Sequence, residues 1–262
     1  MKRWRYVLLV LCTAVISISG TYLMNYFMKS EENKQKYEDI SEIGFPETEA
    51  DHEEENDQQD VKQSEDDFDY QSLIAMNSDC VGWIQIPGTD INYPVVQAAD
   101  NEFYLTHNFN RETAACGAIF MDYRNDVDAK AEHLILYGHQ MKDNSMFKQL
   151  NGYKEEIFYK EHPNIKLYLH EQKYEYEIIA VYVTDVANGG GYYNYLHWNT
   201  RKEQLNYLQQ KMAGYQLYDT GKKVMETDEL LSLSTCEYSC DNGRLIVQAR
   251  RKGKTEDGKQ II

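Results

Sequence analysis

Eight short runs of apolar or alternating residues dominate the chain between residues 83 and 250. Turn residues separate the runs, and β-branched and aromatic residues are frequent within them. Short runs of this kind, with little helix between most of them, predict an all-β barrel or sandwich. The runs are Trp83–Ile86, Ile91–Val96, Gly117–Arg124, His133–His139, Lys166–His170, Tyr174–Val183, Leu230–Thr235 and Arg244–Arg250.

Helical patterns are fewer, and the best of them lies between two predicted strands. Thr200 and Glu203 have the spacing of a capping box, and apolar residues recur at helical spacing over Arg201–Met212. The roughly 46 residues between Val183 and Leu230 therefore form a helix-bearing insertion, which either walls a groove or only covers an edge. Other short helices are predicted at Tyr70–Met76, Asn144–Leu150 and Tyr153–Tyr159.

The N-terminal region carries an uncharged run of 23 residues, Tyr6–Met28. As a helix it would extend about 35 Å, enough to cross a bilayer. Basic residues within residues 1–5 precede it, which places the N-terminus in the cytoplasm and all later residues outside. A cleaved signal peptide, with Ser17 and Ser19 before the cut, is the alternative. Apolar residues continue past that point, so we expect an uncleaved anchor over residues 6–28.

Acidic residues are concentrated just after this run. Residues 31–69 contain 17 Asp or Glu and three Lys. Such a segment buries too little apolar surface to offset its ordering entropy, so residues 29–69 are predicted to be a disordered extracellular tether. Residues 70–262 are then the folded domain. The sequence pI of about 4.8 and the lack of a basic stripe argue against a nucleic-acid partner.

Five cysteines occur in the chain, and Cys12 lies in the predicted anchor. Four in a domain of this length are too few for a disulfide scaffold, and none has zinc-site spacing. We expect at least one free thiol and no metal or other cofactor. A Cys236–Cys240 disulfide is a minor hypothesis, because it would silence Cys236, and no function is predicted for Cys240. The remaining two are Cys80 and Cys116.

Three residues at predicted strand ends could form a nucleophilic site. Cys236 follows the strand Leu230–Thr235, and Arg244 begins the next strand after a short loop. If the two strands pair antiparallel, the guanidinium lies within reach of the thiol, where it could stabilise a thiolate or an oxyanion. His139 ends another apolar strand after Gly138 and is the candidate base. Each residue also has a structural interpretation: a buried filler for Cys236, a turn cap for Arg244 and a structural imidazole for His139.

Taken together, these stretches resemble the class B sortases. The resemblance is carried by "LSTC" with Arg244 eight residues after the cysteine, by "YGH" about a hundred residues upstream, and by further motifs across residues 70–252. Those motifs are "VGWIQIPGTDINYPVVQ", "DNEFYL", "GAIFMDYRN" and "ILYGHQMKDNSMFKQL". The N-terminal anchor and the insertion before the Cys236 strand also fit this class.

The resemblance implies a mostly β fold, a sortase-like eight-stranded β-barrel with short helices, an N-terminal helix and a helix-bearing insertion before the catalytic cysteine strand. It implies a cysteine transpeptidase, anchored in the cell membrane by one span, on the surface of a Gram-positive bacterium. Cys236 would attack the carbonyl after the threonine of a C-terminal sorting motif on a secreted protein. A peptidoglycan cross-bridge amine, on its lipid-linked precursor, would accept the acyl group.

The resemblance also implies roles for individual residues. His139 would act as general acid and base, and Arg244 would hold the substrate carbonyl. The substrate-binding residues carried over are Asn101, Leu105, Tyr137, Ser234, Glu237 and, as a looser match in a tyrosine-rich loop, Tyr193.

Three other functions stay open at this point. A cell-surface cysteine protease would use the same Cys236 and His139 with water as the acceptor. A pilin-polymerising sortase would use a lysine amine. A non-catalytic adhesin would present the barrel as a binding head and would show no selective modification of Cys236 by thiol reagents.

Overall fold

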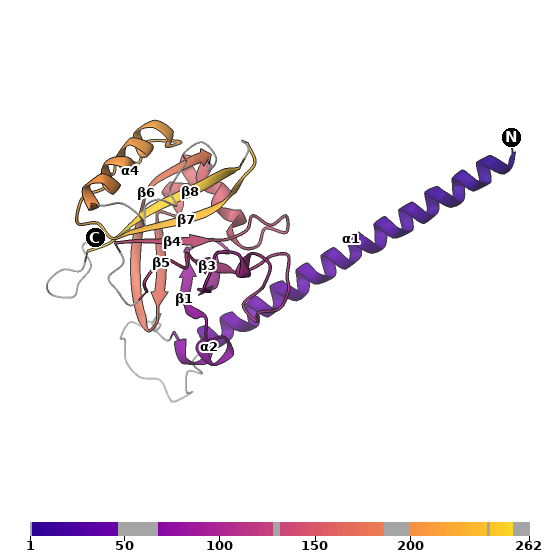
Figure 1. Ribbon diagram of the computed structural model, residues 1–262, viewed down its shortest axis with the longest axis horizontal. Helices are drawn as coiled ribbons and strands as arrows, with labels where there is room; N and C mark the ends of the chain where they lie inside the picture. Colours follow the sequence, from indigo (N-terminus) through magenta and orange to yellow (C-terminus); the bar gives the residue numbers. More distant parts are fainter. Residues whose placement is uncertain (1, 47–67, 128–131, 186–199, 240–241, 254–262) are drawn as a thin grey trace, which may run out of the picture. The chain divides into compact units, whose positions relative to one another are not determined.

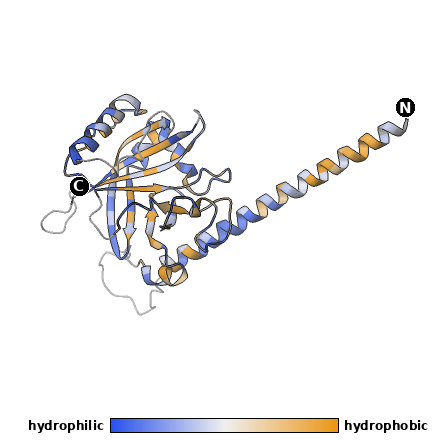
Figure 2. Cartoon of the chain, viewed as in Figure 1, coloured by the Kyte–Doolittle hydropathy of each residue, from blue (hydrophilic) through white to orange (hydrophobic). Residues whose placement is uncertain are grey.

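The computed structural model describes residues 2–46, 68–127, 132–185, 200–239 and 242–253. Contacts between residues divide the chain into two compact units, one up to Asp39 and one from Ile40. The helix α1 (Lys2–Gly44) runs through the first unit and its last residues belong to the second. Figures 1 and 2 show this helix, with apolar residues concentrated in its N-terminal part. Of the described helices, α1 alone is long and apolar enough to cross a membrane.

Residues 29–44, the first part of the predicted disordered tether, are helical in the structure. Residues 29–44 continue α1, because Glu, Lys and Gln favour helices and oppositely charged side chains pair four residues apart, as in the 2.8 Å ion pair between Lys36 and Glu32. The main chain then returns to the same place on the second unit: the amide of Asp69 donates to the carbonyl of Gly44 at 2.9 Å. The rest of the predicted tether, residues 47–67, lies outside the described residues.

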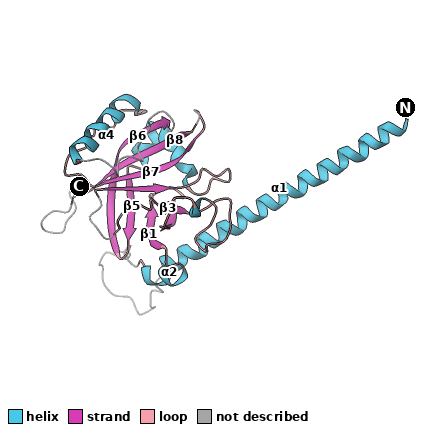
Figure 3. Ribbon diagram, in the orientation of Figure 1, coloured by secondary structure: helices cyan, strands magenta, loops and turns pink. Residues whose placement is uncertain are grey.

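The second unit is built on a closed barrel of eight strands in the order β1-β2-β3-β4-β7-β8-β6-β5 (Figures 1 and 3). The pairs β2–β3 and β4–β7 are parallel, and the remaining pairs are antiparallel. This confirms the predicted eight-stranded, mostly β fold. The strands are β1 (Cys80–Gln85), β2 (Asn92–Val96), β3 (Ile119–Met121), β4 (His133–Tyr137), β5 (Asn164–Leu169), β6 (Gln172–Asp185), β7 (Leu230–Glu237) and β8 (Gly243–Arg251).

Short helices connect these strands. The 3₁₀ helix η2 begins later than the predicted helix at Asn144, because Asn144 and Met146 adopt positive φ angles of 70° and 56° that a helix cannot contain. Helix α3 begins later than the predicted helix at Tyr153, because Tyr153 belongs to the end of η2. The helices are α2 (Tyr70–Met76), η1 (Phe103–Leu105), η2 (Phe147–Lys154), α3 (Glu156–Glu161) and α4 (Arg201–Tyr215).

Helix α4 lies in the insertion before β7, as the sequence predicts. The hydroxyl of Thr200 accepts from the backbone N–H of Glu203 at 3.3 Å, so the predicted cap is present. The apolar stripe of Leu205, Leu208 and Met212 is buried, and α4 contacts β6. The helix runs three residues beyond the predicted end.

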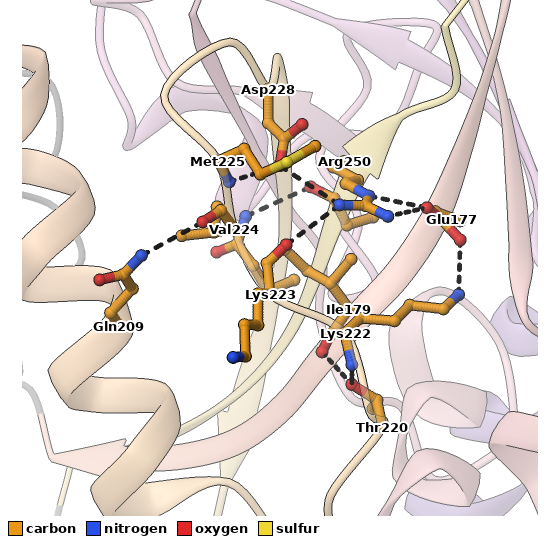
Figure 4. A network of polar contacts seen from close by, with 12 residues as sticks. Glu177, Ile179, Gln209, Thr220, Lys222, Lys223, Val224, Met225, Asp228 and Arg250 are labelled. Atoms are coloured by element: carbon orange, nitrogen blue, oxygen red, sulfur yellow. Dashed lines mark hydrogen bonds and ion pairs between the residues drawn. The ribbon is translucent and has the colours of Figure 1, made fainter.

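A network of charges fixes the segment that leads from α4 back to β7 (Figure 4). Glu177 on β6 forms 2.6 Å ion pairs with both Lys222 of this segment and Arg250 on β8. Arg250 also donates to the carbonyl of Lys223 at 3.0 Å. Burial alone would raise the pKa of Glu177, but the two cations hold it below its usual value. The insertion is therefore tied to two barrel strands immediately before β7 begins.

A second polar network crosses the barrel wall where β4, β7 and β8 lie side by side. The Nε2 atom of buried His133 lies 2.8 Å from the hydroxyl of Ser232, which donates to the amide oxygen of Gln248 at 2.8 Å. The amide nitrogen of Gln204 on α4 lies 3.4 Å from Nδ1 of the same histidine. Burial, together with the nearby Arg201 cation, lowers the pKa of His133 to about 3. The histidine is therefore neutral in the folded protein at ordinary pH.

This network predicts a loss of stability in acid. An unfolded histidine titrates near pH 6.5, so below that pH the unfolded chain binds a proton that the folded chain does not bind until about pH 3. The free energy of unfolding therefore falls as the pH drops through this window. We expect His133→Gln, which cannot titrate, to lose less stability than the wild type between pH 7.5 and 4.5 in urea unfolding. Parallel losses in the two proteins would contradict the prediction.

Candidate active site

Three neighbouring strands bring the predicted catalytic residues to one end of the barrel. In the parallel pair β4–β7, Tyr137 lies opposite Ser234. In the antiparallel pair β7–β8, Cys236 lies directly opposite Arg244. His139 follows β4 by two residues, so it reaches the level of Cys236 on the neighbouring strand.

Hydrogen bonds keep the chain after β4 alongside β7. The backbone N–H of Gly138 donates to the carbonyl of Ser234 at 3.2 Å, and the hydroxyl of Thr235 donates to the carbonyl of Gly138 at 2.8 Å. Beyond His139, the amide of Gln140 donates to the carbonyl of Cys236 at 2.9 Å. The main chain is therefore fixed on both sides of the histidine and at the cysteine.

These residues line a cleft of about 150 Å³. Leu105 is exposed, and His139, Cys236 and Arg244 are half-buried. The cleft is therefore open to solvent and large enough for part of an extended peptide rather than a whole folded partner. Its lining consists of Asn101, Leu105, Phe120, Tyr137, Gly138, His139, Ser234, Thr235, Cys236 and Arg244.

Nε2 of the His139 imidazole lies 2.7 Å from the backbone carbonyl oxygen of Leu105. A carbonyl can only accept, so this contact requires the hydrogen on Nε2. In the neutral ring the basic nitrogen is then Nδ1.

Gly117 leaves room for the contact between His139 and the Leu105 carbonyl. Its φ is +58°, and a Cβ there would lie 2.5 Å from the carbonyl oxygen of Tyr104 and 3.1 Å from Cδ2 of His139.

Cys236 differs from the other two cysteines that the structure describes in the second unit. Cys80 and Cys116 are buried, and burial raises their thiol pKa values to about 12 and about 11. Cys236 is half-buried and lines the cleft. Because the thiolate is the nucleophilic form, the two buried thiols are poor candidates, and Cys236 is the candidate nucleophile.

Arg244 contributes a cation to the same cleft. Its Nη1 donates to the carbonyl of Gly243 at 2.9 Å, and the side chain is half-buried. A thiol, an imidazole with a defined tautomer and a guanidinium at one cleft are the groups needed for acyl transfer through a cysteine. Among the described residues, no three His, Cys, Asp or Glu side chains are grouped so that they could hold a metal ion.

The structure places some of the predicted substrate-binding residues in the cleft and does not describe others. Four of them line the cleft: Asn101, Leu105, Tyr137 and Ser234. Tyr193 and Cys240 lie outside the described residues.

Glu237 is buried and is not part of the cleft lining. Its carboxylate pairs with Lys154 on η2 and accepts from the backbone N–H of Ser239 at 2.7 Å. Burial raises the pKa of Glu237, but the contacts with Lys154 and Ser239 lower it by a larger amount. The pKa is therefore lowered to about 2. The structure therefore places the carboxylate against Lys154 and not in the cleft lining, and its contact with substrate stays a prediction.

Sequence reasoning missed several residues of the site. Phe120 and Thr235 line the cleft, and Gln140 holds the cysteine's carbonyl. Asp122, directly after β3, accepts hydrogen bonds from two cleft residues. The only signal for Asp122 in the sequence was an acid within the predicted strand Gly117–Arg124, and nothing in the sequence identified its partners.

The difference in burial predicts selective modification of Cys236. In the native protein at pH 8, we expect iodoacetamide to label Cys236 at least about tenfold faster than Cys80 or Cys116, because their thiolates are disfavoured by burial. Peptide mapping by mass spectrometry assigns the label to each site. In urea the difference should disappear, and comparable native rates for the three thiols would contradict the prediction.

The chain is similar to known proteins of one family. A family model described as a sortase domain matches residues 84–252. Sortase B of Listeria monocytogenes is 38% identical over 180 residues, covering 68% of this chain and 72% of that protein. Sortase B of Staphylococcus aureus is 30% identical over 261 residues, covering 95% and 97%.

A crystal structure of sortase B from B. anthracis in complex with AAEK1 is similar in fold, with a TM-score of 0.69 and 34% sequence identity. It covers 86% of this chain and 98% of the B. anthracis chain. The residues matched by the family model include Cys236 on β7, Arg244 on β8 and His139 just after β4. The chain belongs to the sortase family of cysteine transpeptidases, as a class B member.

Proposed function

We propose that this sortase cleaves a C-terminal sorting motif of secreted proteins after its threonine and transfers the acyl group to an amine of the peptidoglycan cross-bridge. The observation that carries the proposal is the meeting of Cys236, His139 and Arg244 at one cleft. The cleft is open and suits an extended peptide, and the family acts on sorting-motif substrates and cell-wall precursors.

The first half of the proposed reaction forms a thioester. The thiol of Cys236 gives its proton to Nδ1 of His139 and its sulfur attacks the peptide carbonyl after the threonine. The carbonyl oxygen becomes an oxyanion, which the guanidinium of Arg244 stabilises. When the C–N bond breaks, the same Nδ1 returns the proton to the leaving amine, and the acyl group stays on sulfur.

The second half reverses the proton movements. The acceptor amine attacks the thioester carbonyl, and Nδ1 of His139 takes a proton from it. The C–S bond then breaks, and the thiolate of Cys236 recovers a proton from the imidazolium. The Leu105 carbonyl supports both halves, because it holds the hydrogen on Nε2 and stabilises the ring when Nδ1 is also protonated.

We expect both Cys236→Ala and His139→Ala to abolish cleavage. Loss of a general acid and base lowers a rate by about 10²- to 10⁴-fold, and loss of the nucleophile removes the thioester altogether. The assay is cleavage of a panel of fluorogenic peptides with threonine before the scissile bond, with mass spectrometry of the acyl-enzyme. Cys80→Ala and His162→Ala are matched controls from outside the cleft and should stay active.

The acceptor is tested in the same assay. If an amine is the acceptor, adding a cross-bridge peptide amine should convert the hydrolysis product into a ligated product. Hydrolysis that no amine alters would indicate a cysteine protease, and ligation only to a lysine side chain would indicate pilin polymerisation. An active Cys236→Ala protein would end the assignment.

The proposal also places the protein in the cell membrane, with residues 1–5 in the cytoplasm, the span at residues 6–28 and the catalytic domain outside. The uncharged run and the preceding cations support it, and the described side chains of this part of α1 are almost all exposed. We expect the full chain to stay in the membrane pellet after alkaline carbonate extraction and a chain beginning at Ile40 to be released. Release of both would contradict the anchor.

A further inference from the structure

Asp122 is a fully buried carboxylate beside the cleft that the proposed reaction does not use. It follows β3 directly, and its side chain is 0% exposed. Its Oδ1 accepts from Nε of Arg124 at 2.8 Å and from the backbone N–H of the same residue at 3.0 Å. Its Oδ2 accepts from Nη2 of Arg124 at 2.7 Å. The guanidinium thus meets the carboxylate in a two-pronged ion pair.

The same Oδ2 receives two donors from the cleft wall. The hydroxyl of Tyr137 donates at 2.8 Å, and Nδ2 of Asn101 donates at 3.1 Å. Both residues line the cleft that holds Cys236. One buried oxygen therefore joins the loop before η1 to the end of β4, which are far apart in sequence.

These contacts fix how the two cleft residues present their polar atoms. The Oδ1 atom of Asn101 accepts from the backbone N–H of Tyr123 at 3.0 Å, while its Nδ2 faces Asp122. The amide cannot flip without turning a donor toward a donor. The hydroxyl hydrogen of Tyr137 is directed to Asp122, so in any further hydrogen bond this hydroxyl acts as the acceptor.

The carboxylate must be ionised to do this, because only then are both oxygens acceptors. Burial alone would raise the pKa of Asp122, but Arg124 and Tyr137 hold it below the usual value. Arg124 therefore has a defined part in the network: it keeps a buried charge in place that two cleft residues use.

We propose that Asp122 is a positioning residue, which holds Asn101 and Tyr137 in the orientation in which they meet the bound sorting peptide. The proposal rests on the proposed function, because it assigns Asn101 and Tyr137 to peptide recognition. It predicts that Asp122 acts on binding of the peptide and not on the chemistry at Cys236.

Asp122→Asn is the direct test. An amide offers one oxygen in place of two, and its NH₂ group must face donors on one side. The backbone N–H of Arg124 can only donate, so the oxygen of the new amide must stay on the side now held by Oδ1. The NH₂ group then replaces Oδ2. The Tyr137 hydroxyl faces this NH₂ group and must rotate to accept from it. We expect the KM for a peptide cleaved by the wild type to rise about tenfold, the effect of one or two lost hydrogen bonds, with kcat within about twofold.

Two controls separate positioning from general destabilisation. Ser232→Ala removes an equally buried set of hydrogen bonds on β7 outside the cleft lining, and should leave KM within about twofold. The rate of iodoacetamide labelling of Cys236 should be the same in the wild type and in Asp122→Asn. A KM unchanged by Asp122→Asn, or a parallel loss of thiol reactivity, would overturn the proposal.

A double-mutant cycle tests whether Asp122 acts on KM through Asn101. If Asp122 acts partly through Asn101, the variant that combines Asp122→Asn with Asn101→Ala should be less impaired than the product of the two single effects. Effects that multiply fully would contradict an action through Asn101. If Asp122→Asn does not fold, Arg124→Gln replaces it in the comparison of KM only, because it removes the cation that holds the carboxylate. Thiol labelling is not compared in that variant, since a carboxylate without its cation would itself disfavour the thiolate.

A measurement without any peptide keeps this proposal distinct from the proposed function. In the full chain in detergent micelles, labelled with ¹⁵N-asparagine, the Asn101 side-chain amide is assigned by its disappearance in Asn101→Ala. We expect this amide to be protected from hydrogen exchange in the wild type and to lose protection in Asp122→Asn. Equal exchange in both proteins would overturn the positioning role, whereas failure of the wild type to cleave any peptide would refute only the proposed function.

Discussion

The parallel pairing of β4 with β7 is the constraint on which the site depends. Parallel neighbours point the same way, so the residues that follow them arrive at the same edge of the sheet. His139 and Cys236 are almost a hundred residues apart, yet the pair Tyr137–Ser234 leaves them at the same level. The antiparallel hairpin β7–β8 then needs only a short loop to set Arg244 opposite Cys236.

A parallel pair requires a long crossover, and here it contains η2, α3, β5, β6 and α4. The contacts of this crossover explain how it keeps the strand ends in place. The ion pair of Lys222 with Glu177 fastens its last segment to β6, and the hydrogen bond from Arg250 to the carbonyl of Lys223 fastens it to β8. Lys154 of η2 reaches Glu237 at the end of β7. Lys148 of η2 donates to the side chain of Gln140 at 3.3 Å, which in turn holds the Cys236 carbonyl. The elements between the two catalytic strands therefore also support them.

Sequence periodicity predicted the elements whose environment is repetitive. All eight strands and helix α4 with its Thr200 cap followed from local patterns. Local patterns failed where distant or backbone contacts decide the structure. Positive φ angles make η2 begin later than predicted. Pairs of oppositely charged side chains continue α1 to Gly44, where the composition predicted disorder. Asp122 could not be recognised, because Asn101 and Tyr137 reach it from elsewhere in the chain. The substrate contact of Glu237 was implied by the family resemblance and stays a prediction; no local pattern indicated the ion pair with Lys154.

Each of two buried carboxylates near the cleft is paired with a cation of the protein. Two buried carboxylates lie next to reacting or cleft-lining residues: Glu237 follows Cys236 directly, and Asp122 contacts Tyr137. An unpaired carboxylate at either position would disfavour both a thiolate and an oxyanion, since like charges in a poorly solvated site repel strongly. Lys154 and Arg124 neutralise them within the protein. In the proposed reaction, neither carboxylate would then add an uncompensated negative charge near the oxyanion that Arg244 would stabilise.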